Sequence, residues 1–294
     1  AREAIDLERY LETWRAHHGL RSLSLITARG CPYTCTWCSH TVFGETHRLE
    51  CVTGKPPRVG GLPGRAEATG RGVATVTRMY AEEKRLDPKQ TTVAIQGFGN
   101  VGSWTAAFLA DLGFRVVAVS DVTCARYDPK GLAVEALRTQ HAEANGQLDR
   151  CTIGEKIDRD ALLELPVNVL IPAALSNVLT DKNAARIQAK HVIEAANAPT
   201  TEAGEAALKA RGVHIVPDIL ANAGGVIASY VEWRKARSGS LTPKSETYQV
   251  IDSVIGEAFR NVSRFAAEKK VDWRLAADAV AVQEVVHAMA DRGW

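Results

Sequence analysis

Short apolar runs alternate with longer amphipathic segments through most of the chain, from residue 87 onward. The runs are rich in Val and Ile and predict strands at residues 92–96, 115–120, 167–172, 191–195 and 213–217. The longer segments predict helices at residues 101–112, 131–144, 182–189, 202–210, 245–269 and 272–290. Strands that alternate with helices predict an α/β fold, a doubly wound parallel sheet of the Rossmann type with C-terminal helices.

The first fifty residues have a different pattern. Residues 5–17 predict a polar helix, residues 23–27 predict a short strand, and a cluster of cysteines follows. The composition then changes abruptly near residue 50. We therefore expect a short, unrelated N-terminal segment at residues 1–50 and one large α/β domain at residues 51–294.

Positive and negative side chains nearly balance, with 36 Lys and Arg against 34 Asp and Glu and a net charge of +2. This balance argues against nucleic acid and against an anionic membrane surface as the main partner, so we expect a small-molecule substrate. No run approaches the roughly 18 apolar residues that a membrane-spanning helix needs. The N-terminus is charged instead of carrying an apolar signal core, so we expect a cytoplasmic protein.

A glycine-rich turn follows the first predicted strand and opens the next helix, with Gly97, Gly99 and Gly102 in the order Gly-Phe-Gly-Asn-Val-Gly. The first glycine permits a tight turn, the second lets a pyrophosphate approach the backbone, and the third allows the helix to pack closely on the strand. Amides at the helix N-terminus attract the phosphates. The arrangement predicts a site for a dinucleotide cofactor.

The second strand ends at Asp121, 19 positions after Gly102. An acidic residue near this position can accept hydrogen bonds from the adenosine ribose, although Asp121 could instead only start a turn. Arg126 and Lys130 lie nearby in the sequence and could bind a 2′-phosphate. The cofactor is therefore NAD or NADP.

Several separated blocks together resemble the Glu/Leu/Phe/Val dehydrogenase family, most closely glutamate dehydrogenase. They match in order and approximate spacing, at residues 53–56 (Thr-Gly-Lys-Pro), 60–73, 96–102, 171–175, 194–200, 216–226 and 229–233. The resemblance covers residues 51–294. It implies an NAD(P)-dependent enzyme that oxidises glutamate to 2-oxoglutarate and ammonia and assembles as a homo-oligomer. Leucine, valine and phenylalanine are the alternative substrates, but Ser229 and the Gly-Leu-Pro-Gly-Arg run favour glutamate.

The resemblance also implies which residues bind the ligands. Thr69 and Asn100 match positions that contact the dinucleotide, and Asn197 and Asn222 match positions that hold the nicotinamide and its ribose. The full set expected to bind cofactor is Thr69, Gly97, Gly99, Asn100, Val101, Gly102, Asp121, Ala173, Asn197 and Asn222. Ser229 matches a contact to the side-chain carboxylate of the substrate. Turn formation after a strand is the alternative for the two asparagines, and an ordinary helix serine is the alternative for Ser229.

We assign no catalytic residue. Deamination requires a lysine of lowered pKa and a carboxylate that move protons, and in the resembled family these precede the Thr-Gly-Lys-Pro block. Here that block begins at Thr53, and Lys55 within it is interpreted as a solvated loop residue. We therefore expect the chain to bind cofactor but to turn over poorly or not at all. A non-catalytic dinucleotide-binding fragment is the alternative function.

Three cysteines, Cys31, Cys35 and Cys38, resemble the opening of a radical S-adenosylmethionine enzyme. Three thiolates at this spacing can ligate three irons of a [4Fe-4S] cluster. The rest of the chain does not resemble the barrel that such chemistry needs. A fusion, a joined fragment or a zinc site with His40 and Cys51 are the alternatives. We interpret the cysteines as free thiols and assign no metal.

Overall fold

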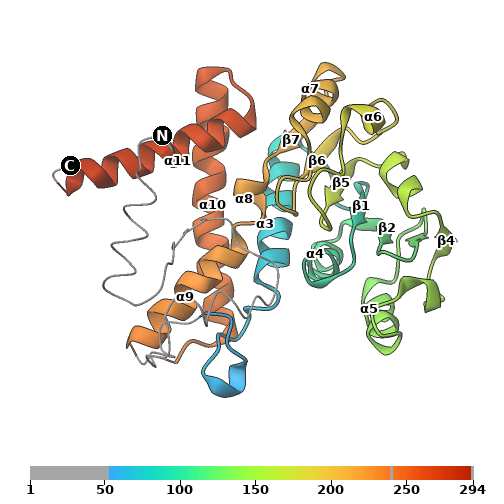
Figure 1. The fold of residues 1–294 in the computed structure, drawn as a ribbon, viewed down its shortest axis with the longest axis horizontal. Helices are drawn as coiled ribbons and strands as arrows, with labels where there is room; N and C mark the ends of the chain where they lie inside the picture. Colours follow the sequence, from blue (N-terminus) through green and yellow to red (C-terminus); the bar gives the residue numbers. More distant parts are fainter. Residues whose placement is uncertain (1–52, 239–240, 293–294) are drawn as a thin grey trace, which may run out of the picture.

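A computed structural model describes residues 53–238 and 241–292 of the chain. Within them one sheet has the strand order β4-β3-β2-β1-β5-β6-β7 (Figure 1). The five parallel strands are β1 (Thr92–Gln96), β2 (Arg115–Ser120), β5 (Val169–Pro172), β6 (His191–Ile193) and β7 (His214–Val216). The predicted doubly wound α/β fold is confirmed, with β1 and β2 at their predicted bounds and the other three strands shorter than predicted.

Two short antiparallel strands, β3 (Ala125–Tyr127) and β4 (Glu155–Ile157), extend the sheet beyond β2 and were not predicted. Ser120 of β2 pairs with Ala125 of β3, and Ala125 pairs with Ile157 of β4. Because β3 reverses direction and β4 reverses it again, β4 runs parallel to β2. The carboxyl ends of β2 and β4 therefore lie at the same edge of the sheet as the carboxyl end of β1.

The helices surround the sheet. They are α3 (Ala68–Lys84), α4 (Asn100–Asp111), α5 (Val134–Glu143), α6 (Asp181–Ala184), α7 (Glu202–Ala210), α8 (Asp218–Ala221), α9 (Gly224–Ser238), α10 (Lys244–Lys269) and α11 (Trp273–Asp291). Short 3-10 turns lie at η3 (Pro57–Val59), η4 (Leu148–Arg150) and η5 (Asp160–Glu164). The helix predicted at residues 182–189 is wrong in length, because α6 ends at Ala184. Helices α3, α8 and α9 were not predicted.

Each face of the sheet has its own core, because successive strand residues point to opposite faces. On one face, Val93 and Ile95 of β1 belong to a cluster that includes buried residues of α3, α4 and α10. On the other face, Ala94 belongs to a cluster that includes buried residues of η5, α6 and α7. In Figure 1, α3 lies between the sheet and α10. Burial on both faces explains why these strands are apolar along their whole length.

Helix α11 extends away from the sheet (Figure 1). Its N-cap, Asp272, accepts hydrogen bonds from the backbone N–H groups of Arg274 (3.0 Å) and Leu275 (3.1 Å). Acidic N-caps of this kind satisfy helix N–H groups that have no partner within the helix. None of the described helices is both long and apolar enough to cross a membrane.

Candidate functional site

The predicted site residues gather at one edge of the sheet. Parallel strands have their carboxyl ends at a common edge, and the segments after β2, β1, β5, β6 and β7 follow one another along it. These segments contain, in that spatial order, Asp121, the glycine-rich turn, Ala173, Asn197 and Asn222. In an open α/β sheet, ligands bind at this edge where the strand order changes direction, which here is between β1 and β5.

The glycine-rich turn has the geometry that its sequence predicts. Gly97 has φ of +100°, a conformation that side chains rarely adopt. A Cβ added to Gly102 would lie 1.8 Å from the carbonyl oxygen of Gly97, so the close approach requires glycine. Gly99 is different: it is the exposed N-cap of α4, and a Cβ there would meet no atom within 4 Å. The space beside the first turn of α4 is therefore open to an anion, and no acidic residue lies in that turn.

Helices α3 and α9 place further predicted residues beside this turn. The side-chain amide of Asn100 donates to the backbone oxygen of Ala66, just before α3 (2.7 Å). A Cβ on Gly225, at the start of α9, would lie 2.6 Å from the hydroxyl oxygen of Thr69. The structure therefore brings Thr69 next to the segment that follows Asn222.

Asp121 lies directly after β2, and the protein itself satisfies its carboxylate. Oδ1 accepts from the backbone N–H (2.6 Å) and hydroxyl (2.5 Å) of Thr123 and from the N–H of Cys124 (3.1 Å). Oδ2 accepts from the N–H of Leu148 (2.6 Å). Burial alone would raise the pKa of Asp121, but these hydrogen bonds outweigh it and hold the pKa below its ordinary value. The carboxylate thus closes the turn between β2 and β3, and its contact with a ribose stays a prediction.

The structure argues against the alternative that Arg126 and Lys130 bind a 2′-phosphate. The buried guanidinium of Arg126 donates to the backbone oxygens of Leu148 (2.9 Å), Asp149 (3.1 Å) and Gly154 (3.2 Å). Lys130 follows β3, whose last residue, Tyr127, pairs with Ala118 in the middle of β2. Because β3 is antiparallel to β2, the chain there runs toward the opposite edge of the sheet. These residues are close to Asp121 in sequence but not at the cofactor edge of the sheet, because β3 runs away from the glycine-rich turn.

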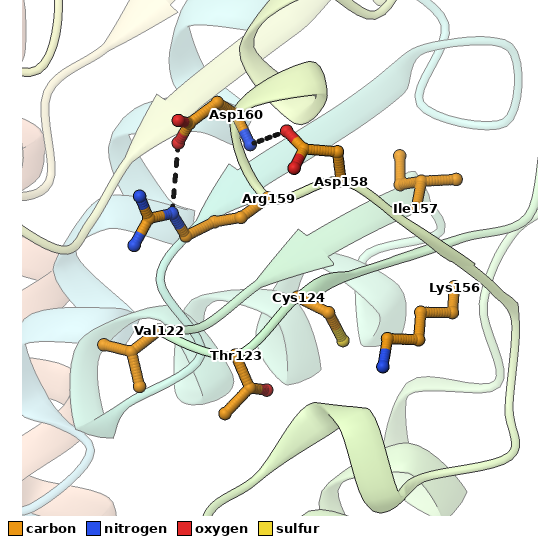
Figure 2. A pocket seen from close by; sticks show the side chains of 8 residues that line it. All are labelled: Val122, Thr123, Cys124, Lys156, Ile157, Asp158, Arg159 and Asp160. Carbon is orange, nitrogen blue, oxygen red and sulfur yellow. Dashed lines mark hydrogen bonds and ion pairs between the residues drawn. The ribbon is translucent and has the colours of Figure 1, made fainter.

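A hollow of about 520 Å³ lies between the turn that follows Asp121 and the end of β4 (Figure 2). Its lining comes from the turn after β2 and from the end of β4 and the segment that follows: Val122, Thr123, Cys124, Lys156, Ile157, Asp158, Arg159 and Asp160. Arg159 pairs with Asp160 (3.0 Å), and Asp160 donates its N–H to Asp158 (2.9 Å). Side chains of both charge signs therefore line this hollow.

On the other side of β1, the segment after β5 lies against the first glycine. The N–H of Ala173 donates to the backbone oxygen of Gln96 (2.7 Å), and a Cβ on Gly97 would lie 2.9 Å from the Cβ of Ala174. Further along the edge, the side-chain amide of Asn222 donates to Oδ1 of Asn197 (2.8 Å). The two asparagines therefore meet, although they are 25 positions apart.

The asparagine pair rests on a group of charged residues. Asp218, the first residue of α8, accepts a hydrogen bond at Oδ2 from the N–H of Ala198 (2.7 Å). Its own N–H donates to Oε2 of Glu194 (3.0 Å), which is fully buried at the end of β6. The guanidinium of Arg274, from α11, lies 2.8 Å from the same oxygen of Glu194. Burial raises the pKa of Glu194, and the positive charge of Arg274 opposes that rise.

A second polar pair lies on α9, beyond Gly225. Nη2 of Arg65 donates to the hydroxyl of Ser229 (2.9 Å), and this hydroxyl donates to the backbone oxygen of Gly225 (3.1 Å). Within the described residues, Arg65 has no carboxylate within 4.0 Å, although Glu232 acts on it at longer range. Burial lowers the pKa of Arg65 and Glu232 opposes the shift, but a guanidinium stays charged. The pair can therefore receive a carboxylate ligand.

Lys55 is not the solvated loop residue that the sequence predicted. Its ammonium lies 3.4 Å from Glu232, and only 11% of its side chain is exposed. Glu232, on α9, is fully buried and also accepts from the N–H groups of Gly54 (2.8 Å) and Lys55 (3.1 Å). The ion pair anchors the Thr-Gly-Lys-Pro segment to α9, which is a structural use of this lysine.

The sequence interpretation gave no role to Asp218, Glu194 or Arg274, and it used Arg65 only as part of the Gly-Leu-Pro-Gly-Arg run. Asp218 directly follows the strand predicted at residues 213–217, and Glu194 lies at the end of the one predicted at residues 191–195, so their position at the end of a parallel strand was a usable signal. Nothing near Arg274 in the sequence shows that the first turn of α11 contacts Glu194, Glu205 and Asp218. Cys31, Cys35 and Cys38, together with His40 and Cys51, lie outside the described residues.

Comparisons with known proteins agree with this geometry. Residues 60–293 match the family model described as Glutamate/Leucine/Phenylalanine/Valine dehydrogenase. Glutamate dehydrogenase of Thermotoga maritima is 42% identical over 255 residues, which cover 86% of this chain and 60% of that protein. Glutamate dehydrogenase of Aeropyrum pernix is 43% identical over 248 residues (83% and 59%). A cryptic catabolic NAD-specific glutamate dehydrogenase of Bacillus subtilis is 39% identical over 243 residues (83% and 56%).

Solved structures give the same result. A glutamate dehydrogenase from Peptoniphilus asaccharolyticus superposes with a TM-score of 0.71 at 35% identity, over 82% of this chain and 57% of that one. A hetero-hexameric glutamate dehydrogenase from Thermus thermophilus, in its leucine-bound form, gives 0.76 at 29% identity, over 98% and 62%. The chain spans between 56% and 60% of the length of the three relatives named above. With the family model matched over residues 60–293, the chain belongs to the glutamate/leucine/phenylalanine/valine dehydrogenase family.

Proposed function

We propose that this chain provides the dinucleotide-binding part of an NAD(P)-dependent glutamate dehydrogenase. The observation that carries the proposal is the open space at Gly99, beside the N-terminus of α4 and on the same sheet edge as the paired Asn197 and Asn222. A pyrophosphate at Gly99 would place adenosine toward Asp121 and nicotinamide toward the asparagine pair. Bound NAD or NADP supplies the hydride acceptor.

The Arg65–Ser229 pair supports glutamate as the substrate class. Ser229 lies one turn after Gly225 on α9, so the pair is about 6 Å along the helix from the residue that touches Thr69. A planar guanidinium beside a hydroxyl can bind a carboxylate with more than one hydrogen bond. The amino acid would therefore place its side-chain carboxylate at Arg65 and its amine-bearing carbon at the nicotinamide. An aliphatic side chain would leave the partly buried cation of Arg65 without a carboxylate partner.

We assign no proton-transfer residue within residues 53–238 and 241–292. For this reason we expect the purified 294-residue chain to bind cofactor without steady reduction of it by glutamate. Assembly with further copies is part of the proposal, and the hexameric form of the Thermus thermophilus relative supports it.

Fluorescence titration of the purified chain with NADH and with NADPH tests the cofactor site. Gly99→Val is the informative variant, because the added carbons fill open space and Gly99 already has an ordinary φ of −75°. We expect it to weaken binding at least about tenfold, or 1.4 kcal/mol, with the melting temperature kept. Ala136→Val, which places the same valine side chain on the exposed face of α5, is the control. Saturable binding by the wild-type chain supports the proposal, and absence of binding of either nucleotide contradicts it.

A second titration tests the substrate class. Once the tighter dinucleotide saturates the chain, 2-oxoglutarate and 4-methyl-2-oxopentanoate are added in separate series, and the change in cofactor fluorescence is followed. We expect 2-oxoglutarate to bind more tightly, and Ser229→Ala to weaken its binding at least about tenfold, as loss of a hydrogen bond to a charged group predicts. Equal binding of the two keto acids, in the wild type and in Ser229→Ala, would contradict a glutamate-type substrate.

A further inference from the structure

The guanidinium of Arg274 joins three acidic residues from three different elements. Nη2 lies 2.8 Å from Glu194 after β6, Nε lies 2.6 Å from Glu205 on α7, and Nη1 lies 3.4 Å from Asp218 on α8. Glu194 is fully buried, and Asp218 and Glu205 expose only 11% and 12% of their side chains. A rigid planar guanidinium suits such a junction, because each acidic group can accept from a different N–H group at its edge.

Asp218 connects this junction to both asparagines of the candidate nicotinamide site. Its carboxylate accepts from the N–H of Ala198 (2.7 Å), the residue that follows Asn197. Its backbone oxygen accepts from the N–H of Asn222 (3.0 Å), the residue that ends α8. The position of one aspartate therefore determines where Asn197 and Asn222 meet.

The segment after β6 needs this support. Ala198 has φ of +44°, a left-handed conformation that a residue with a Cβ disfavours. Besides its N–H bond to Asp218, its carbonyl oxygen accepts from the N–H of Asn177, in the segment after β5 (2.9 Å). Two hydrogen bonds from distant segments thus hold Ala198 in a conformation that its own sequence does not favour.

We propose that Arg274 is a positioning residue for the nicotinamide half of the cofactor, acting through Asp218 on the Asn197–Asn222 pair. The inference rests on the proposed function, because it assumes that this pair contacts nicotinamide. Arg274 touches neither ligand itself. It neutralises Glu194 and orients Asp218, so that the Ala198 N–H has a fixed carboxylate oxygen to bond.

Loss of Arg274 would change the charge balance of the junction. Glu194 and Asp218 would then face each other through the Asp218 N–H without a cation between them. Like charges at this separation repel, and we expect the Asp218 carboxylate to rotate away from Glu194. That rotation would release the N–H of Ala198 and shift Asn197 away from Asn222. The adenosine and pyrophosphate contacts, on the far side of β1, would not change.

The experiment compares two ligands on the purified 294-residue chain. One is the reduced dinucleotide that binds more tightly, and the other is the matching ADP-ribose, which lacks nicotinamide. Arg274→Gln is measured against the wild type, with Arg274→Lys as the conservative variant. Leu208→Ala, which shortens a fully buried side chain of α7, controls for lost stability. Arg264→Gln, on the exposed face of α10, controls for lost charge.

We expect Arg274→Gln to weaken dinucleotide binding about tenfold, equivalent to the loss of one or two hydrogen bonds. The affinity for ADP-ribose should change by less than about twofold. On a logarithmic scale this is less than half of the tenfold change expected for the dinucleotide. Arg274→Lys, which keeps the charge but not the fork, should fall between the wild type and Arg274→Gln. Leu208→Ala should lower the melting temperature without changing the ratio of the two affinities.

Other outcomes separate the inference from the proposed function. Unchanged dinucleotide binding in Arg274→Gln, or equal weakening of both ligands, would overturn the inference alone. If the wild-type chain binds ADP-ribose as tightly as the dinucleotide, the asparagine pair does not hold nicotinamide, and the inference also fails. If the wild-type chain binds neither ligand, the proposed function itself is wrong.

Discussion

At the phosphate end of the candidate site, six consecutive residues, 97–102, make the essential structure, whereas the nicotinamide end joins segments as far as 80 positions apart. The phosphate end uses glycine conformation and backbone amides. The nicotinamide end uses side chains from β6, α8 and α11. A site made from local backbone geometry can be predicted from a short sequence motif. A site made from long-range charge contacts becomes visible only in the folded structure.

The largest effect should come from the third glycine of the turn. Gly102→Ala places a Cβ 1.8 Å from the backbone oxygen of Gly97, so the turn or the start of α4 must move. We expect loss of measurable NADH and NADPH binding and a free energy of unfolding lower by about 3 kcal/mol. Urea unfolding and fluorescence titration measure both. Wild-type affinity in Gly102→Ala would show that the phosphate end does not depend on its glycine geometry.

The same contrast explains how much of the fold was predictable. Strands β1 and β2 have their predicted bounds because both are apolar, buried on both faces and flanked by clear turns. Strands β3 and β4 are three residues each and pair at the sheet edge, too short for a pattern to appear. Helix α3 was not predicted because Gly70 and Gly72, which are poor helix formers, lie in its first turns. They are there for packing: a Cβ on Gly70 would lie 2.7 Å from Trp104.

The site divides in the same way. The resemblance of separated blocks indicated Asn197, Asn222 and Ser229, and the structure brings the first two together and places Arg65 on the third. Arg65 itself was visible in the sequence only as part of a block. The contacts of Asp218 and Arg274 depend on how α11 packs against α7 and α8, which no local pattern specifies.

A pH series on Arg274→Gln should give the next largest effect. Glu194 is faced by Arg274 from α11 and by Asp218 from α8, while Glu205 on α7 also pairs with Lys209 (2.5 Å). Burial raises the pKa of Glu194 in the folded chain, and without Arg274 it should rise further. A raised pKa gives stability that is present at low pH and is lost as pH rises through the folded pKa.

Arg274→Gln should therefore be about 3 kcal/mol less stable than the wild type at pH 8, since it leaves a buried carboxylate unpaired. As pH falls and Glu194 takes up a proton, the deficit should shrink to about 1 kcal/mol. Urea unfolding across this range measures the deficit. A deficit that is constant with pH, or that grows as pH falls, would show that Glu194 does not titrate in the variant.

Asp121 should have a smaller effect, with the opposite dependence on pH. Asp121→Asn removes a carboxylate that accepts from Thr123, Cys124 and Leu148, and we expect it to cost about 2 kcal/mol at pH 7. Because the pKa of Asp121 is lowered, its contribution is present above the unfolded pKa of about 3.9 and is lost as pH falls through the folded value.

The difference between wild type and Asp121→Asn should therefore stay constant from pH 7 down to about pH 4 and shrink as pH falls further. Asp128→Asn, a turn residue whose carboxylate accepts from the N–H of Lys130 (2.8 Å) on the exposed surface, is the matched control. The same variants show whether Asp121 also binds ribose. In that case Asp121→Asn weakens NADH more than nicotinamide mononucleotide, which has no adenosine, whereas a role confined to the turn affects neither ligand selectively.

The smallest effect should come from Ala198→Gly, and it tests whether the nicotinamide end is held from outside. Glycine removes the cost of φ +44°, about 1 kcal/mol, but adds a similar entropy to the unfolded chain, so stability should change by less than about 0.5 kcal/mol. Dinucleotide affinity should change by less than about twofold, because the hydrogen bond from the Ala198 N–H to Asp218 is kept. On a logarithmic scale this is less than half of the tenfold effect expected for Arg274→Gln. A selective loss of dinucleotide over ADP-ribose affinity would mean that Ala198 itself stiffens the segment. The nicotinamide end would then depend on local conformation, as the phosphate end does, and the contrast between the two would be smaller than the long-range contacts indicate.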